Sequence, residues 1–448
     1  MTKRPTTIFV CSKCDAQYPK WMGRCTECGS WSTLNEQVKR VAKKASAGKS
    51  GTVETLATFQ TENQTRLKCG MNEFDRVLGG GLVPGSVTLL GGDPGIGKST
   101  LVLQVGGLLA AAGKTVLYVS GEESSSQVKI RFERLGLKTH NLKFLGETDV
   151  DTIIATIDEH RPVLVLLDSI QTMRCAEVDS EPGSIGQVRA VTGKLVEAAK
   201  NGHTPIIIVG HVTKQGNVAG PRTLEHLVDV VLYLEGDDRH LFRVLRGVKN
   251  RFGATSEVGV FDMQRGGLRE VPNPSAIFLS ERQHTNPGSV VTAIVEGSRS
   301  FLVEVQALVS RTNFGYPQRR ASGFDLNRLQ LLIAVLMKKA GLYLSNQDIH
   351  LNVAGGWRVN EPAVDAAVCL AIASATRGRP VPADTAVFGE VGLSGEMRAV
   401  SQTEKRLEEV KKMGFKYCVM PSTKVQVMPH GLKLIMATTI TDAIKDIV

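Results

Sequence analysis

Short apolar runs alternate with helix-like segments through the middle of the chain. The runs are SVTLLGG, TVLYVSG, PVLVLLDS, PIIIVGH and VVLYLEG. Runs of this length, separated by helical patterns, are typical of buried strands joined by crossover helices. The pattern therefore predicts an α/β domain with a mainly parallel sheet over residues 66–271.

A different pattern follows Pro272 and Pro274, which interrupt any regular element. VVTAIVEG and FLVEVQALV favour strands, LNRLQLLIAVLMKKAG has the spacing of an amphipathic helix, and PAVDAAVCLAIASATRG is typical of a buried helix. We therefore expect a separate α+β domain over residues 272–448.

Four of the eight cysteines are clustered near the N-terminus, in the pattern Cys11-x-x-Cys14 and Cys25-x-x-Cys28. Two tight turns can bring four thiolates to one tetrahedral centre, so the spacing predicts a structural zinc ribbon over residues 1–35. Four unligated thiols are the alternative. Residues around the turns either contact a nucleic acid or a protein, or simply cover the metal: Lys13, Lys20, Trp21, Arg24 and Trp31.

The stretch after the cysteines, QVKRVAKKASAGKSG, is rich in Lys, Ala, Ser and Gly and has little to bury. It predicts a flexible basic linker over residues 36–65. The whole chain carries a net charge of +10, which is compatible with a polyanionic partner such as nucleic acid. No run approaches the roughly 18 apolar residues of a membrane span, so we expect a cytoplasmic protein with no membrane segment.

The segment GDPGIGKST matches the phosphate-binding loop G-x-x-x-x-G-K-[ST], and it lies between a predicted strand and a predicted helix. Its glycines let backbone N–H groups face the phosphates of ATP, Lys98 reaches the β- and γ-phosphates, and Ser99 helps to hold Mg²⁺. The predicted nucleotide-binding residues are Gly92, Asp93, Pro94, Gly95, Ile96, Gly97, Lys98, Ser99 and Thr100.

Carboxylates stand at the ends of two later strands. Asp168 ends PVLVLLD, where a second residue that organises Mg²⁺ is expected, and Glu122 and Glu123 follow TVLYVSG. One of these glutamates can polarise the attacking water; the alternative is that both are merely solvated loop acids. A further strand ends near His211, Thr213 and Lys214, at a level where a polar group could sense the γ-phosphate.

The order of these elements, with DRVLGGGLVPGS before the phosphate loop, resembles the RecA and DnaB group of motor ATPases. KNRFG, at residues 249–253, looks like the signature of the bacterial RadA (Sms) family, and the four-cysteine ribbon is a second feature of that family. The resemblance implies a DNA-stimulated ATPase that forms hexameric rings on single-stranded DNA. It also implies branch migration of recombination intermediates, with branched DNA and a RecA-type recombinase as partners.

The resemblance also assigns roles to residues. Glu122 matches the water-activating position better than Glu123, and Lys249 and Arg251 would act across a subunit boundary like an arginine finger. The alternative is that KNRFG is only a basic turn ahead of a strand.

Two segments that follow strands have the composition of mobile DNA-tracking loops: TMRCAEVDSEPGSIGQVR and KQGNVAGPR. Lys214, Asn217 and Arg222 are the candidate DNA contacts, and Arg174 and Arg189 are weaker ones. Neither loop offers a convincing aromatic side chain for base stacking, which favours contact with the DNA backbone.

The last domain resembles the proteolytic domain of Lon through NVAGG, EPAVDAAVCLAIASA and FGEVGLSGEMRAV. The nucleophile position carries Ala363, and the position of the base falls near Glu404, with Lys405 adjacent. A base without a nucleophile forms no acyl-enzyme, so we expect a non-proteolytic platform for assembly and DNA binding. Its basic pairs could meet duplex DNA or be ordinary surface charge: Arg319 with Arg320, and Lys338 with Lys339.

Two other functions remain open. A KaiC-like ring would switch state on ATP hydrolysis and bind proteins instead of DNA. An ATP-dependent Lon-type protease is disfavoured by Ala363.

Overall fold

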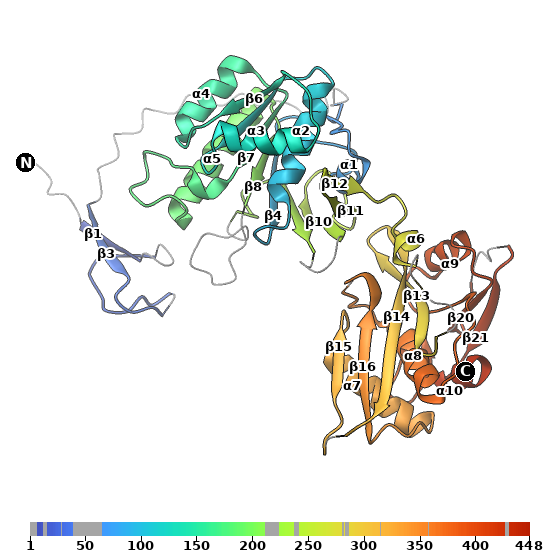
Figure 1. Cartoon of the computed structure of the whole chain (residues 1–448). Coiled ribbons are helices and arrows are strands. Elements are labelled where there is room, and N and C mark those ends of the chain that lie inside the picture. Colours follow the sequence, from blue (N-terminus) through green and yellow to red (C-terminus); the bar gives the residue numbers. More distant parts are fainter. Residues whose placement is uncertain are drawn as a thin grey trace, which may run out of the picture. The chain divides into compact units, whose positions relative to one another are not determined.

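The computed structural model describes residues 7–11, 16–27, 29–38, 65–210, 224–236, 242–279, 282, 286–313, 315–356, 358–425 and 430–448. The chain divides into two compact units, Met1–Gln64 and Thr65–Val448 (Figure 1). Among the described residues, none of the helices has the length and apolar character that a membrane crossing requires.

The first unit contains a small antiparallel sheet. Its strands are β1 (Thr7–Cys11), β2 (Gln17–Tyr18) and β3 (Leu34–Val38), in the order β2-β1-β3. Cys11, Cys25 and Leu34 are buried together at its centre. Two of the four predicted zinc ligands therefore lie in this small core, whereas Cys14 and Cys28 fall outside the described residues.

The second unit begins with a nine-stranded sheet in the order β12-β11-β10-β9-β4-β8-β7-β5-β6. Six of its strands run parallel: β4 (Val87–Gly92), β5 (Val116–Ser120), β6 (Leu142–Leu145), β7 (Leu164–Asp168), β8 (Ile206–Val209) and β9 (Val230–Glu235). Strands β4, β5, β7 and β8 are buried at every residue, as expected for a sheet covered on both faces.

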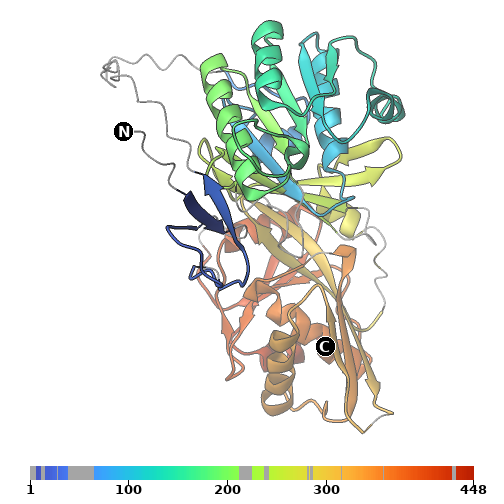
Figure 2. The same ribbon diagram turned by 90° about the vertical axis from the view of Figure 1, so that its left-hand side faces the viewer.

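Helices cover both faces of this sheet because successive strand residues point to opposite sides. On one face, Leu90, Tyr118 and Leu166 pack with α1 (Asn72–Val77) and α2 (Lys98–Ala111), and α3 (Ser125–Arg134) borders this layer. On the other face, the alternate strand residues pack with α4 (Val150–His160) and α5 (Ile185–Gly202). Figure 2 shows these helices on the two sides of the sheet. The predicted α/β fold with a mainly parallel sheet is confirmed.

Three antiparallel strands extend the sheet beyond β9: β10 (Phe242–Asn250), β11 (Val258–Gln264) and β12 (Gly267–Glu270). The strand-like segment LFRVLRGV forms most of β10, as its sequence predicts. Strands β11 and β12 and the edge strand β6 were not predicted from the sequence.

The C-terminal part contains a mixed seven-stranded sheet in the order β15-β16-β14-β13-β17-β20-β21. Its strands are β13 (Ser289–Glu296), β14 (Arg299–Arg311), β15 (Arg319–Ser322), β16 (Gln347–Val353), β17 (Thr385–Val387), β20 (Tyr417–Pro421) and β21 (Lys433–Ala437). A separate hairpin joins β18 (Glu390–Val391) to β19 (Met397–Arg398).

One face of this second sheet packs against α7 (Leu326–Lys339), α8 (Asp365–Arg377) and α10 (Ile440–Ile447), and the other against α9 (Thr403–Lys412). The remaining helical elements are short: α6 (Pro274–Phe278), η4 (Ala354–Gly356) and η5 (Pro362–Val364). Helix α8 is buried along most of its length, as its apolar sequence predicted. The predicted α+β fold of this part is thus confirmed, while residues 65–448 form one compact unit.

Candidate nucleotide site

The loop Gly92–Thr100 joins the end of β4 to the start of α2, which is the strand-to-helix setting that the motif predicts. Gly92, Gly95 and Gly97 adopt φ angles of 149°, 77° and 112°, a region that favours glycine. A Cβ on Gly92 would lie 2.4 Å from the Leu234 carbonyl oxygen, so no larger residue fits there. The loop thus leads into the N-terminus of a 14-residue helix, whose dipole and unpaired N–H groups attract anions.

Lys98 is buried, with 3% of its surface exposed, inside this loop. Its Nζ donates hydrogen bonds to the carbonyl oxygens of Gly92, at 2.8 Å, and Asp93, at 2.9 Å. Burial lowers the pKa of Lys98 to about 8, while the carboxylates of Asp168, Asp93 and Glu122 act in the opposite direction. A buried ammonium in such a loop gains most from a bound polyanion, so the residues fit a nucleotide polyphosphate.

Asp168 ends β7 and is 5% exposed. The Tyr118 hydroxyl, from the adjacent strand β5, donates a 2.6 Å hydrogen bond to Asp168 Oδ2. Burial, followed by the charge of Asp168, raises the pKa of Tyr118 above its ordinary value, so the phenol stays protonated and remains the donor. Since only one carboxylate oxygen is engaged by this bond, the arrangement fits an acid that helps to organise Mg²⁺.

Glu122 and Glu123 lie in different surroundings although they are neighbours. The parallel register places Ser120 opposite Asp168, so the loop after β5 lies beside the end of β7. There the Ser169 hydroxyl donates a hydrogen bond to Glu122 Oε1. Glu123 instead forms an ion pair with Arg131 of α3. The geometry therefore favours Glu122 for activating water.

Lys249 and Arg251 both reach the segment 224–229, which follows the second predicted DNA loop. Lys249 Nζ donates to the carbonyl oxygens of Glu225, at 2.6 Å, and Val228, at 2.8 Å. Arg251 pairs with Asp229 at 3.1 Å and is half exposed. Burial, followed by the charge of Arg251, lowers the pKa of Lys249. Within one chain these cations thus hold the segment 224–229.

The structure describes the first of the two predicted DNA loops, whereas the second lies outside the described residues. Lys214, Asn217 and Arg222, together with His211 and Thr213, lie outside the described residues. The first loop is shorter than we expected, because α5 begins at Ile185 and carries Arg189 on its exposed side. The expectation that its composition makes it mobile is also at odds with its packing. The buried Gln187 amide bonds to the backbone of Cys175, Val178 and Ser180 and so fixes the loop against the helix.

In the C-terminal part, Ala363 is buried in η5 and Lys405 is exposed on α9. Arg406, the neighbour of Lys405 on α9, is fully buried and paired with Glu361, two residues before Ala363. Arg406 Nη1 also donates to the Ala293 carbonyl oxygen at 2.5 Å. An ion pair therefore occupies the region where the resemblance to Lon would place a nucleophile and a base.

Sequence reasoning missed Tyr118, Ser169 and Arg406. Tyr118 sits inside an ordinary apolar strand, and its role depends on the partner across the sheet. Ser169 offered a signal, because it directly follows the predicted magnesium-organising acid. Nothing in the sequence distinguishes Arg406 from the solvated charges around it on α9.

Family models match three parts of the chain. Residues 54–217 match an AAA domain, residues 9–36 match a rubredoxin metal binding domain, and residues 330–424 match subunit ChlI of Mg-chelatase. Together with the two sheets described above, these matches confirm the predicted fold class of a zinc ribbon, a parallel-sheet ATPase core and a C-terminal α+β domain. Among solved structures, a RadB recombinase crystal structure aligns with a TM-score of 0.37 and 24% identity, over 46% of this chain and 99% of that chain.

Curated relatives match nearly the whole chain. A DNA repair protein RadA from Bacillus subtilis is 48% identical over 98% of this chain and 97% of its own length. The proteins of the same name from Pseudomonas aeruginosa and Listeria monocytogenes are 49% and 46% identical, each over 98% of both chains. Because these relatives are 46–49% identical over nearly the whole chain, the chain belongs to the RadA family of RecA-like ATPases.

Proposed function

We propose that this protein is a DNA-dependent ATPase of recombinational repair, a ring-forming motor on single-stranded DNA that promotes branch migration. The observation that carries the ATPase assignment is the meeting of Lys98, Asp168 and Glu122 at the carboxyl edge of one parallel sheet. Near-full-length similarity to DNA repair proteins supports the assignment to repair.

ATP would be held by the backbone of Gly92–Thr100, with Lys98 at the β- and γ-phosphates. Ser99 and Asp168 would hold Mg²⁺, which when bound neutralises charge on the phosphates. Burial of Lys98 and Asp168 strengthens their electrostatic action, because little water screens them.

Glu122 would orient and polarise the attacking water. Ser169 directs its carboxylate toward the strand end that carries Asp168. Glu123 is neutralised by Arg131 and is held by a 3.1 Å bond from its own N–H to Ser120 Oγ, so it serves to shape the loop. A general base contributes on the order of 10²- to 10⁴-fold to a reaction rate.

The second proposed element is coupling to DNA and to a neighbouring subunit. Lys214, Asn217 and Arg222 would contact the DNA backbone, and the loop that carries them leads into the segment 224–229. Lys249 and Arg251 already hold that segment. In a homo-hexamer the same two cations would face the neighbour's γ-phosphate, so that they connect DNA contact with hydrolysis.

The other parts of the chain would have supporting roles. Cys11, Cys14, Cys25 and Cys28 would bind a structural Zn²⁺, and the C-terminal domain would be a non-proteolytic platform for assembly and DNA. A buried alanine at the nucleophile position and the Arg406–Glu361 pair support the absence of peptide hydrolysis. Single-stranded and branched DNA and a RecA-type recombinase would be the partners.

The two adjacent glutamates provide the test. Glu122→Gln should bind ATP like the wild type and lose about 10²-fold or more in turnover, together with branch migration of a synthetic three-strand junction. Glu123→Gln is the matched control, and it should keep turnover within a few-fold. Equal losses in the two variants, or full activity in Glu122→Gln, would refute the assignment.

A further inference from the structure

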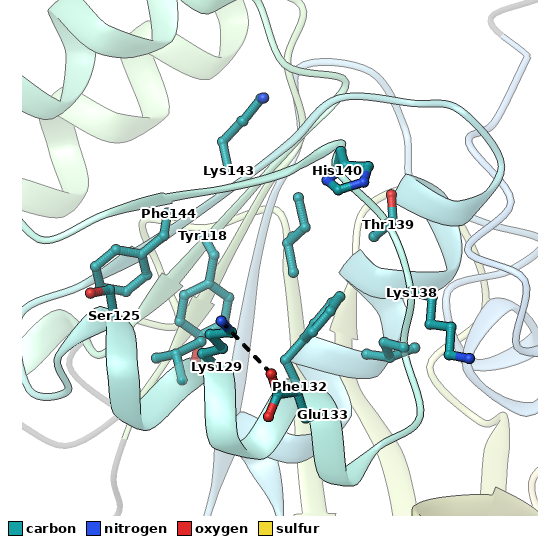
Figure 3. Close-up of a pocket in the computed structure, with 13 residues that line it drawn as sticks. Tyr118, Ser125, Lys129, Phe132, Glu133, Lys138, Thr139, His140, Lys143 and Phe144 are labelled. Carbon is teal, nitrogen blue, oxygen red and sulfur yellow. Dashed lines mark ion pairs between the residues drawn. The ribbon is translucent and has the colours of Figure 1, made fainter.

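A pocket of about 590 Å³ lies on the outer edge of the ATPase sheet, between α3, the edge strand β6 and the loop that joins them. Its floor is apolar and includes Tyr118, Phe132, Leu142 and Phe144. Figure 3 shows the Phe132 ring projecting into the pocket, with Tyr118 and Phe144 along one side. This volume lies within the roughly 300–1,000 Å³ of small-molecule sites.

The rim of the pocket is cationic. The lining contains Lys129, Lys138 and Lys143, together with His140, against the single carboxylate of Glu133. Lys129 Nζ lies 3.8 Å from Glu133 Oε1, so the charges of these two residues compensate each other. Lys138 and Lys143 then give the rim of the pocket a net positive charge. Both extend away from the apolar floor in Figure 3. An apolar floor under a cationic rim favours a ligand with an apolar body and an anionic group.

A single side chain, Tyr118, connects the pocket with the proposed nucleotide site. The buried Tyr118 ring lies in its floor and stacks on Phe144, with ring centres 6.5 Å apart, while the Tyr118 hydroxyl donates a hydrogen bond to Asp168. Helix α3 supplies a second connection. Val128 and Phe132 of α3 line the pocket, and Arg131 of the same helix holds Glu123, beside the proposed catalytic Glu122.

We propose that this pocket binds a small aromatic or aliphatic anion and that Tyr118 transmits its occupation to Asp168. A ligand packed on Phe144 holds that ring against the buried Tyr118 ring, which restricts the Tyr118 hydroxyl to its bond with Asp168 and thereby fixes the orientation of that carboxylate. Mg²⁺ should then bind with ATP at a lower concentration, because less ordering remains to be done. Only this second step rests on the proposed ATP site; binding at the pocket does not.

Binding is tested on the full chain with 8-anilinonaphthalene-1-sulfonate, an aromatic anion, by fluorescence titration. The wild type should show saturable binding at one site, and Phe132→Ala should weaken it about tenfold, because an aromatic contact is lost. The double charge reversal Lys138→Glu with Lys143→Glu changes only exposed groups, so it preserves the fold, and it should weaken binding similarly.

Ile130→Ala is the matched control, because Ile130 lies on the same helix, is 68% exposed and does not line the pocket. It should bind the probe like the wild type. If Phe132→Ala and the charge reversal also bind the probe like the wild type, the pocket is not the site and the inference is wrong.

Transmission is tested through the Mg²⁺ concentration needed for half-maximal ATP binding, which requires no hydrolysis. Saturating probe should lower this concentration about fivefold in the wild type, at the weak end of typical coupling between two sites. Tyr118→Phe keeps the ring in the pocket floor and removes the hydroxyl, so it should bind the probe and show no shift. An equal shift in Tyr118→Phe, or none in the wild type, would refute the transmission. Loss of ATP binding in all variants would instead count against the proposed function.

Discussion

At the scale of single residues, Lys98 has an unusual environment for a lysine. Its ammonium is enclosed by the carbonyl oxygens of its own loop, and its pKa lies near 8 instead of 10.5. The free protein therefore begins to lose this charge above about pH 7 and has lost about half of it near pH 8, whereas phosphates bound beside it favour the charged form.

This difference predicts a pH dependence of nucleotide affinity. Between about pH 7 and 9 the affinity for ATP should fall, and binding should take up a proton, since the pKa of Lys98 rises on binding. Calorimetry in two buffers of different ionisation enthalpy measures the uptake. Lys98→Ala should abolish it, and an ATP affinity that is constant across this range in the wild type would contradict the account.

Some of the site residues could be predicted from the sequence, and others could not. The phosphate loop and Asp168 were predictable because each belongs to a local pattern, a motif or the end of an apolar strand. The choice between Glu122 and Glu123 was not, since it depends on Arg131 in the next helix and on Ser169 across the sheet. Their sequence positions alone do not specify those contacts.

At the scale of elements, the end of β10 and the segment 224–229 form one assembly. Lys249→Ala removes two hydrogen bonds to the carbonyl oxygens of Glu225 and Val228, so backbone amides of 224–229 should exchange faster with solvent. ATP affinity should be unchanged because Lys98 and Ser99 remain. DNA-dependent hydrolysis or branch migration should be impaired, while ring assembly survives. Val248→Ala, at a half-exposed position of the same strand, is the control for both readouts.

Arg251→Lys tests the same assembly with the charge retained. The planar guanidinium can engage a phosphate through two parallel hydrogen bonds, and an ammonium cannot. We therefore expect Arg251→Lys to bind ATP normally and to migrate branched DNA poorly. Wild-type rates of hydrolysis and migration in this variant would show that KNRFG is a structural turn.

The elements themselves were predictable to different extents. Strands buried on both faces can be predicted from their continuous apolar runs. The amphipathic α7 and the buried α8 can likewise be predicted from their hydrophobic patterns. The four-residue strands β6 and β12 lack that continuous apolar pattern, and the packing of the first predicted DNA loop depends on contacts of one buried residue, Gln187. Tertiary packing, and not the local sequence pattern, determines the structure of these segments.

At the scale of the whole molecule, the division into units Met1–Gln64 and Thr65–Val448 separates the cysteine ribbon from the ATPase. Cys28→Ala should therefore release zinc and loosen residues 1–35 while thermal unfolding of the remainder is unchanged. Metal analysis and calorimetry on the full chain test this. Absence of zinc from fully reduced wild-type protein would contradict the predicted site.

We propose that one polypeptide couples ATP hydrolysis to DNA. ATP turnover with and without single-stranded DNA, for the wild type and Lys98→Ala side by side, tests this coupling. DNA should raise the wild-type rate, and Lys98→Ala should lose about three orders of magnitude in turnover under both conditions. Wild-type turnover that is indifferent to DNA would refute the coupling and favour an ATP-switched ring that binds proteins.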